Sequence, residues 1–441
     1  MKENKKQICL INDSFPPVID GVANAVLNYA SWIEKKYGDA TVVTPFYPDT
    51  NDDQYDFDVV RYPSIDTSKL LGYRAGLPFD RETVAVLEEK HFDLIHAHCP
   101  MTAAMLARLL KQQEDIPLVL TYHTKYDIDI ANAIRSEILQ EEAIRLLVEN
   151  INAFDEVWTV SSGARDNLRK IGYSGACTVM PNGVDLPKGA VDDEIVKKLK
   201  SEHDIPEDVP VYLFIGRMMW YKGIRIILDA LSELTHPFCM VFVGDGNDKE
   251  EIVKYTEEKG LNDRVIFVDA VRDRQAIRSW YSLGDLFLFP STFDTNGLVV
   301  REAAACGLPA VLVEGSCAAE GVEHGVNGYL IEENSQSLAK LLSELNESHE
   351  GVRSCGEKAM DTLYLSWEDA VHNACLMYDE VITRYKAGEY PKKKQLDNIL
   401  YKNMAKLFGT FNTYEEKLWS GIDTAFDYLE EMDAAIDRIL R

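Results

Sequence analysis

The sequence predicts an α/β protein with two doubly wound domains, each built around a mainly parallel sheet. Three observations lead to this fold class: the length of 441 residues, the alternation of short apolar runs with helical patterns, and the restart of that alternation near the middle of the chain. A chain of this length exceeds what one hydrophobic core usually serves. Continuous apolar strands separated by helices indicate a parallel sheet that is covered on both faces.

The first half of the chain, residues 1–187, is the predicted N-terminal domain. A Pro/Gly turn and a helix at about 23–36 follow its first strand. The seven predicted strands of this domain are residues 7–12, 40–44, 58–61, 93–96, 117–121, 156–160 and 177–180. Each run is short and apolar, as expected for strands that are buried on both faces.

Residues 188–370 form the predicted C-terminal domain, which begins in an acidic, lysine-containing stretch at about 188–208. Its predicted strands are residues 211–215, 239–243, 264–268, 285–289 and 309–313. Ligands of such sheets bind outside the carboxyl ends of the strands. Two facing sheets therefore predict an active site in the cleft between the domains.

The end of the chain changes character. Residues 371–386 are predicted to form a helix that packs back on the N-terminal domain, and residues 387–441 a helical, acidic extension. The extension carries apolar residues at helical spacing, namely Ala425, Phe426, Leu429, Met432, Ile436, Ile439 and Leu440. Such a helix either packs on its own protein or forms a self-association or partner interface, and the sequence leaves both open.

Composition limits the possible partners. The formal net charge of −27 excludes broad nucleic-acid binding, which needs a basic surface. It also disfavours wide adhesion to an anionic bilayer, although a local basic patch is still compatible with peripheral contact. The eight cysteines form no Cys-x-x-Cys pair, and the start of the chain shows no signal-peptide stretch. We expect a cytoplasmic protein, at most peripheral on the cytoplasmic membrane face.

Two strand-to-helix turns carry candidate phosphate ligands. Gly21 opens a helix after the first strand and would let a phosphate approach the backbone amides, although such a glycine is often only conformational. Arg217 and Lys222 bracket the first turn of the second domain. A diphosphate leaving group needs cations when no metal neutralises it. The forked guanidinium of Arg217 can bind two oxygens, and the ammonium of Lys222 supplies a mobile point charge.

A third element places two acids eight positions apart, with seven residues between them. Asp294 precedes Gly297, and Glu302 lies in the following helix. The helix N-terminus near Gly297 presents free amides to an anion or to sugar hydroxyls. Glu302 is suited to accept hydrogen bonds from a ribose diol. The alternative for Asp294 is a helix cap, and for Glu302 a solvated helix position.

His96 and His98 alternate on one strand and therefore share a face, as two metal ligands would. Because no third ligand is near in sequence, we expect no metal site here and place both histidines along the interdomain cleft.

The motifs together resemble glycosyltransferase family 4 of the GT-B fold. The resemblance covers roughly residues 7–385. Its motifs are Pro16-Pro-Val-Ile-Asp-Gly-Val22, Thr121-Tyr-His-Thr124, Pro181-Asn-Gly-Val-Asp185, Gly216-Arg with Lys222-Gly, Val243-Gly-Asp-Gly246 and the two spaced acids. It implies two Rossmann-like domains that face each other across a cleft, and a retaining sugar transfer from a nucleotide-sugar donor without a further cofactor.

Residue roles follow from this resemblance. Asp20 and Gly21 lie in the first motif, and Gly21, Arg217 and Lys222 would hold the diphosphate. His123 is similar to the family's active-site histidine beside the donor sugar. The remaining implied ligands are Glu302 for the ribose, the backbone near Val271 for the base, Asp294 for sugar hydroxyls, and the amides of Asn296, Gly297, Leu298 and Val299 for sugar and phosphate.

One residue departs from the family pattern. The first of the two acids is usually glutamate, and here it is Asp294. The carboxylate is one methylene shorter, which puts its own role and the donor preference in doubt. By resemblance the leaving phosphate would act as the base for the acceptor hydroxyl, on the same face of the sugar.

The acceptor is less well defined than the donor, for which we expect UDP-glucose. Residues 61–64, 73–78 and 122–126 are similar to glycolipid-forming members such as diacylglycerol glucosyltransferases. Residues 68–79 combine Lys69 and Arg74 with apolar side chains, which suits either a lipid surface or an ordinary cleft loop. We expect a membrane lipid such as diacylglycerol, and a soluble sugar or small molecule is the alternative.

Two other functional classes fit the sequence less well. A non-catalytic GT-B-like scaffold or binding protein would not need Arg217, Lys222, His123 and Glu302 together. A GT-B phosphorylase with a pyridoxal cofactor has no matching motif here, and the chain is short for that class.

Overall fold

The computed structural model describes residues 5–18, 20–67, 74–134, 136–346 and 349–393. The chain divides into two compact units. The N-terminal unit comprises Met1–Val160, Ala164–Met180 and Val371–Arg441, and the C-terminal unit comprises Ser161–Gly163 and Pro181–Ala370. The main chain therefore leaves the N-terminal unit after Met180 and returns to it at Val371.

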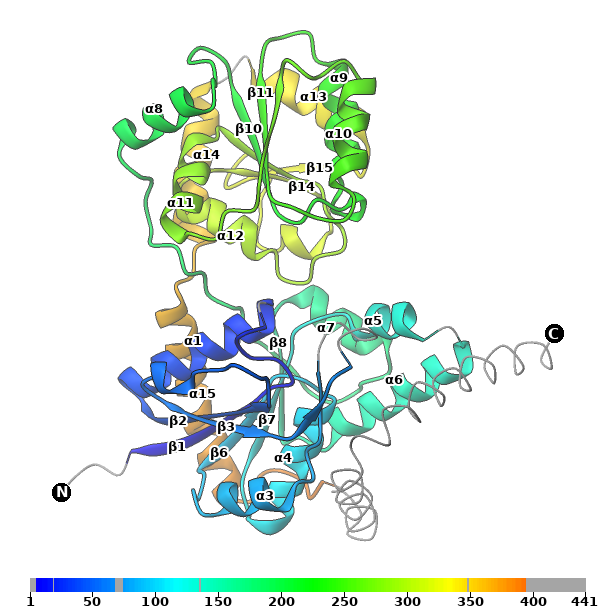
Figure 1. Ribbon diagram of the computed structural model, residues 1–441, viewed down its shortest axis with the longest axis vertical. Coiled ribbons are helices and arrows are strands. Elements are labelled where there is room, and N and C mark those ends of the chain that lie inside the picture. Colours follow the sequence, from blue (N-terminus) through cyan, green and yellow to red (C-terminus); the bar gives the residue numbers. More distant parts are fainter. Residues whose placement is uncertain (1–4, 19, 68–73, 135, 347–348, 394–441) are drawn as a thin grey trace. The chain divides into compact units, whose positions relative to one another are not determined.

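The N-terminal unit is built on a seven-stranded sheet in the order β3-β2-β1-β6-β7-β8-β9, with all neighbouring strands parallel (Figure 1). The strands are β1 (Lys6–Ile11), β2 (Gly38–Pro45), β3 (Asp58–Tyr62), β6 (Leu94–Ala97), β7 (Leu118–Tyr122), β8 (Glu156–Thr159) and β9 (Thr178–Val179). Central strands such as β6 and β7 are buried along their whole length, as both-face coverage requires.

The helices of this unit are α1 (Gly21–Lys36), α3 (Arg81–Glu88), α4 (Thr102–Gln113), α5 (Tyr126–Ala133), α6 (Glu137–Asn152), α7 (Ser162–Lys170) and α15 (Trp367–Lys386). A short antiparallel pair, β4 (Ser64–Ile65) and β5 (Ala75–Gly76), and the 3-10 turn η1 (Asp52–Gln54) lie beside the sheet. The part of α15 from Val371 onward belongs to this unit, and its Tyr378 and Asp379 contact Tyr37 at the end of α1.

The C-terminal unit repeats the architecture with a six-stranded parallel sheet in the order β12-β11-β10-β13-β14-β15. Its strands are β10 (Val211–Ile215), β11 (Cys239–Val243), β12 (Val265–Val268), β13 (Leu286–Phe289), β14 (Ala310–Val313) and β15 (Tyr329–Ile331). Every residue of β10, β11 and β13 is buried, because helices cover both faces of the sheet.

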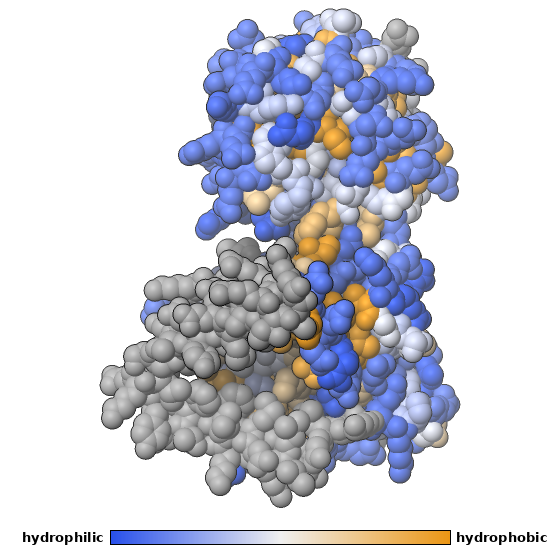
Figure 2. Space-filling model, turned by 90° about the vertical axis from the view of Figure 1, so that its right-hand side faces the viewer, coloured by the Kyte–Doolittle hydropathy of each residue, from blue (hydrophilic) through white to orange (hydrophobic). Residues whose placement is uncertain are grey.

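The covering elements of this unit are α8 (Asp193–Glu202), η2 (Trp220–Lys222), α9 (Ile224–Glu233), α10 (Lys249–Glu258), α11 (Arg274–Leu283), α12 (Leu298–Ala305), η3 (Cys317–Ala319), α13 (Ser335–Leu345) and α14 (His349–Thr362). Figure 1 shows α9, α10 and α13 on one face of the sheet, and α8, α11, α12 and α14 on the other. In Figure 2, hydrophilic side chains cover most of the visible face of this unit, and apolar ones are scattered among them.

The predicted fold class is confirmed, since both units are doubly wound α/β structures with parallel sheets. Two features were not predicted, the three-residue strand β15 and the β4–β5 pair, because runs of two or three residues carry no readable period. The predicted helical extension covers residues 387–441, and of these, residues 394–441 lie outside the described residues. Among the residues described, no helix is both long and apolar enough to span a membrane.

Candidate functional site

The strand orders define where each unit is expected to bind a ligand. In a doubly wound sheet this is the carboxyl edge at the point where the strand order reverses. The reversal lies between β1 and β6 in the N-terminal unit, and between β10 and β13 in the C-terminal unit. Gly21 follows β1, whereas Arg217 and Lys222 follow β10 and Asp294 follows β13. The predicted residues are therefore at the topological switch points of their own units.

The loop after β10 is held in place by a close backbone contact. Gly223 adopts φ +79° between η2 and α9, a left-handed conformation that favours glycine. A side-chain carbon on Gly223 would also clash with the carbonyl oxygen of Pro290, at the end of β13. The contact fixes Lys222 beside the β13 loop. Arg217, near the start of the same turn, is exposed.

Lys222 and Asp294 form an ion pair. The Lys222 Nζ lies 2.6 Å from Asp294 Oδ1, and the Ser291 hydroxyl donates to Asp294 Oδ2 at 2.6 Å. The Lys222 side chain is 9% exposed and that of Asp294 is 22% exposed. The Lys222 ammonium also lies 5.7 Å from the centre of the Phe289 ring. The Lys222 ammonium is therefore partly desolvated, and its position is set by Asp294. This acid was expected to bind sugar hydroxyls.

The N-terminus of α12 presents unpaired donors. Gly297 caps the helix with φ +57° and approaches Ala318 so closely that a side-chain carbon would lie 3.0 Å from its Cα. The first backbone bonds of the helix run from Val300 and Arg301 to the Gly297 carbonyl. The amides of Leu298 and Val299 therefore have no intrahelical acceptor, as at any helix start. Both polar atoms of the Asn296 side chain are buried without a partner among the described residues.

Glu302 is not the solvated helix position that the sequence allowed. Its Oε1 accepts from Arg274 at 2.6 Å, and its Oε2 accepts from the Tyr281 hydroxyl at 2.9 Å. Burial by itself would lower the pKa of Arg274, but the Glu302 carboxylate raises it on balance. Burial and then the same carboxylate raise the pKa of Tyr281 well above its ordinary value. Val271 is half-buried in the loop between β12 and α11, which carries Arg274.

The first turn of α1 carries Asp20 and Gly21. Asp20 caps the helix, since its Oδ1 accepts from the amides of Val22 and Ala23 at 2.8 and 2.7 Å. Gly21 is exposed, and no atom lies within 4 Å of the place where its side-chain carbon would be. The fold itself therefore leaves room for a side chain at position 21.

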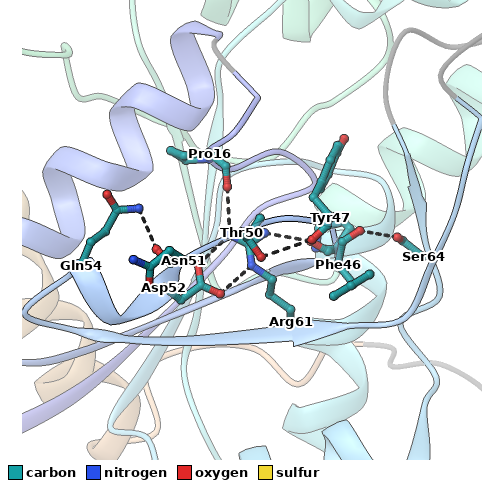
Figure 3. A network of polar contacts seen from close by, with 10 residues as sticks. Pro16, Phe46, Tyr47, Thr50, Asn51, Asp52, Gln54, Arg61 and Ser64 are labelled. Atoms are coloured by element: carbon teal, nitrogen blue, oxygen red, sulfur yellow. Dashed lines mark hydrogen bonds and ion pairs between the residues drawn. The ribbon is translucent and has the colours of Figure 1, made fainter.

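The largely buried side chain of Arg61 stabilises the loop that precedes Gly21. Arg61 on β3 pairs with both carboxylate oxygens of Asp52, and donates to the backbone oxygens of Pro45 and Pro16 (Figure 3). Its side chain is 7% exposed. The bond to Pro16 ties the β1–α1 loop to the edge of the sheet. The guanidinium is therefore occupied within the protein, although its sequence motif was compared with lipid-acceptor segments.

Three histidines lie together at the carboxyl ends of β6 and β7. His98 Nδ1 and His123 Nε2 are 3.0 Å apart, and both rings are buried. His96 contacts the hydroxyls of Tyr378 and Thr121 at 2.6 and 2.7 Å. Burial lowers the pKa of His123 to about 3 and that of the other two well below 6.5. The cluster is therefore neutral at physiological pH.

Asp13 is a half-buried acid that sequence reasoning did not single out, although it lies two residues after the end of β1, at the edge of the sheet where ligand-binding residues are expected. Its carboxylate accepts from the amides of Thr102 and Ala103 at 3.1 and 2.7 Å, and so caps α4. Burial raises its pKa to about 6, and the bonds it accepts offset part of that rise. Asp13 therefore titrates within a range that is easily reached in solution.

Asp13 should give stability an unusual pH dependence. Because its pKa rises on folding from 3.8 to about 6, the folded state binds the proton more tightly. Its contribution is complete below pH 3.8 and is lost as the pH rises through about 6, a change of about 3 kcal/mol in the free energy of unfolding. Urea unfolding from pH 4 to 7.5 should show the wild type losing stability relative to Asp13→Asn by roughly this amount.

Asp39 provides the control for that titration. A hydrogen bond from Lys5 lowers the pKa of Asp39 below its ordinary value of 3.8, so the stabilising effect of this carboxylate is nearly complete at pH 4, and the difference between wild type and Asp39→Asn should change little from pH 4 to 7.5. A constant difference between wild type and Asp13→Asn across the same range would contradict the assignment to Asp13.

Within the described residues, the structure brings together Lys222 with Asp294, and Asn296 to Val299 at one helix start. It shows partners that the sequence did not reveal, namely Ser291 for Asp294, and Arg274 and Tyr281 for Glu302. Arg274 and Tyr281 lie 28 and 21 positions before Glu302, so no local motif indicates these two contacts, whereas Ser291 lies only three positions before Asp294. No group of three or more His, Cys, Asp or Glu side chains in the described ranges has the geometry of a metal site.

Comparison with protein families gives two matches that together span most of the chain. Residues 19–188 match the model described as Glycosyltransferase Family 4, and residues 196–362 match the one described as Glycosyl transferases group 1. The first range contains the Asp20–Gly21 turn and His123. The second contains Arg217, Lys222 and the α12 element.

Individual relatives are more distant. An alpha-monoglucosyldiacylglycerol synthase of Acholeplasma laidlawii is 25% identical over 369 residues, which is 80% of this chain and 91% of that protein. A D-inositol 3-phosphate glycosyltransferase of Xylanimonas cellulosilytica is 26% identical over 68% of this chain and 74% of that protein. The crystal structure of Anabaena Alr3699/HepE in complex with UDP-glucose is similar with a TM-score of 0.66, at 22% identity, over 86% of this chain and 99% of that one.

Proposed function

The chain belongs to glycosyltransferase family 4 and has the GT-B fold, and from this premise we propose that it transfers glucose from UDP-glucose, with retention, to a hydroxyl of a membrane lipid such as diacylglycerol. The proposal rests mainly on the groups that lie at the topological switch point of the C-terminal unit. There a partly buried lysine, an exposed arginine and the free amides of a helix start are suited to hold a diphosphate.

Charge development explains why these groups suit a leaving diphosphate. When the bond from the sugar to the β-phosphate breaks, negative charge grows on the phosphate oxygens. Lys222 supplies a cation shielded from water, and Arg217 a planar fork with several donors. The amides of Leu298 and Val299 add fixed dipoles at the positive end of α12. No metal ion is needed in this scheme, because the chain supplies the positive charge.

The other predicted residues are assigned to the remaining parts of the donor. Glu302 is held by Arg274 and Tyr281, and each of its oxygens keeps a second lone pair for a ribose hydroxyl. Val271 would offer its backbone to the base. His123 and Asp294 would contact sugar hydroxyls, and the buried amide of Asn296 gains partners if a sugar or phosphate lies beside it.

Names of relatives support both acceptor classes. The Acholeplasma relative is named for a glucosyldiacylglycerol product, which supports the lipid acceptor, and the Anabaena protein was crystallised with UDP-glucose. The Xylanimonas relative is named for an inositol phosphate acceptor, which supports a soluble small molecule as the second candidate.

A donor panel tests the proposal. Binding and hydrolysis of UDP-, GDP- and ADP-sugars would be measured with and without vesicles that contain diacylglycerol. The proposal predicts that UDP-glucose binds, and that it turns over faster with vesicles, giving an α-linked glucolipid. Turnover that is independent of vesicles would favour the soluble acceptor. Failure to bind any nucleotide sugar would contradict the transferase and favour a GT-B-like binding or scaffold protein.

Gly21 offers a test that separates binding from folding. An alanine at position 21 meets no atom within 4 Å, so Gly21→Ala should not destabilise the protein and should stabilise it by up to about 1 kcal/mol. If the diphosphate approaches this backbone, the methyl group should weaken UDP-glucose binding by about tenfold, the loss of roughly 1.4 kcal/mol. Isothermal titration and thermal unfolding measure the two effects.

The matched control is Gly172→Ala, since Gly172 is also surrounded by open space but has φ +107°. That change should lower stability without changing donor affinity. Unchanged donor affinity in Gly21→Ala would remove Gly21 from the diphosphate site.

A further inference from the structure

We propose that His98 is a positioning residue that fixes the tautomer and ring orientation of His123. The inference rests on the proposed function, because it takes His123 to lie beside the donor sugar. His98 itself is fully buried and has no role in the donor contacts described above.

The backbone places the two rings together. Strands β6 and β7 are parallel neighbours, with Ala97 opposite Leu120. His98 follows β6 directly, and its amide donates to the carbonyl of Ile11 at 2.8 Å. His123 follows β7 directly. The planes of the His98 and His123 rings are tilted by only 26°, and the ring centres are 5.2 Å apart. His98 Nδ1 lies 3.0 Å from His123 Nε2.

Other rings prevent His98 from turning. The His96 ring lies 4.0 Å away, centre to centre, and the Tyr29 ring meets His98 edge-on at 5.2 Å. His96 is itself fixed by the hydroxyls of Thr121 and Tyr378. The Tyr378 ring stacks on Trp158 at 5.4 Å. His98 is thus held by a rigid aromatic surround, as a residue that orients another must be.

The contact couples the two tautomers. Both imidazoles are neutral, because burial keeps their pKa values well below 6.5. A hydrogen bond between neutral rings needs one N–H group and one lone pair. If His98 donates from Nδ1, His123 must carry its own proton on Nδ1. In the reverse arrangement, His123 carries its proton on Nε2 and donates it to His98.

The unpartnered atom of His98 selects between these arrangements. His98 Nε2 is buried and has no hydrogen-bond partner among the described residues. Buried N–H groups without a partner are rarer than buried acceptors without one. The proton of His98 is therefore on Nδ1, and His98 donates to His123 Nε2. His123 then keeps its proton on Nδ1, so that this nitrogen is a donor and not a base.

The test follows the tautomer directly. The full chain, labelled with 15N-histidine, gives long-range 1H–15N correlations that distinguish a protonated Nδ1 from a protonated Nε2. The His123 signals, assigned by their loss in His123→Ala, should show the proton on Nδ1. In His98→Leu the His123 tautomers should mix, whereas His98→Asn, whose amide can replace the Nδ1 donor, should restore the wild-type form.

Kinetics should follow the spectra. In His98→Leu we expect kcat to fall by about tenfold or more with a smaller change in the KM for UDP-glucose, and His98→Asn should recover most of it. Tyr378→Phe is the control, because it removes a hydrogen bond from His96 in the same cluster but keeps the ring on Trp158. It should change neither the His123 tautomer nor kcat.

The possible negative results contradict different claims, either the role of His98 or that of His123. A wild-type His123 protonated on Nε2, or a tautomer that is unchanged in His98→Leu, would overturn the inference and leave the role of His123 intact. If His98→Leu does not fold, the wild-type spectrum and the His98→Asn variant still decide. Full activity of His123→Ala would overturn the role of His123 beside the donor instead.

Discussion

Replacement of Lys222 by alanine is expected to lower kcat by about 10²–10³-fold, the range for loss of one preorganised charge-stabilising group. Lys222 is 9% exposed at the switch point of the C-terminal unit, where its ammonium has little water to screen it. The loss should appear mainly in kcat, because the charge on the phosphate grows as the glycosidic bond breaks. Steady-state kinetics with UDP-glucose measure it.

Removal of Lys222 also leaves Asp294 without its counter-ion, and this effect must be separated from the chemistry. The double variant Lys222→Ala/Asp294→Asn removes both charges. If the slow turnover of Lys222→Ala came only from an unpaired Asp294, the double variant would recover. We expect it to remain slower than the single variant Asp294→Asn, which is measured beside it because Asp294 is itself proposed to contact the sugar. Lys249→Ala, which breaks an ion pair with the exposed Asp269, is the matched control and should keep full activity. Near-wild-type turnover in Lys222→Ala would contradict the diphosphate role.

Replacement of Glu302 by glutamine is expected to weaken UDP binding by about 10–100-fold. A hydrogen bond to a charged group contributes roughly 1.5–3 kcal/mol, and glutamine keeps the shape but loses the charge and one acceptor oxygen. The carboxylate is already oriented by Arg274 and Tyr281, so it needs no reorganisation to receive a ribose diol. Isothermal titration with UDP measures the loss.

A donor analogue isolates the ribose contact. Wild type should bind 2′,3′-dideoxy-UDP more weakly than UDP, and Glu302→Gln should bind the two nearly equally. Glu251→Gln, which changes an acid that accepts from the Trp220 indole, is the control and should behave as wild type. Equal discrimination between UDP and the analogue in wild type and Glu302→Gln would exclude Glu302 from the ribose site.

The fold was largely predictable because buried parallel strands are continuous apolar runs. The runs at β10 and β11 were placed to the residue, since all five positions of each are apolar and buried. The strand β15 was missed because three residues show no period. The carboxyl-edge rule likewise located the turns that carry Arg217, Lys222 and Asp294, without any knowledge of side-chain contacts.

The partners of the site residues were not predictable, because they are tertiary. Asp294 was expected to face a sugar, yet it pairs with Lys222, which lies 72 positions earlier in sequence. Glu302 was assigned from its place in a motif, and its contact with Arg274 depends on how α11 packs beside α12. Asp20 was assigned only through its place in the first motif, and its role as the cap of α1 became visible in the structure.

The path of the chain between its two units has a consequence for biosynthesis. The N-terminal unit is interrupted by Pro181–Ala370 and includes α15 from Val371 onward. On the ribosome, Tyr378 emerges long after His96 and Tyr37, the residues that it and its neighbour Asp379 contact. The first unit to be translated is thus completed only after the second has been synthesised. Expression of residues 1–180 alone should give a protein with an uncovered helix-binding face, prone to association during synthesis.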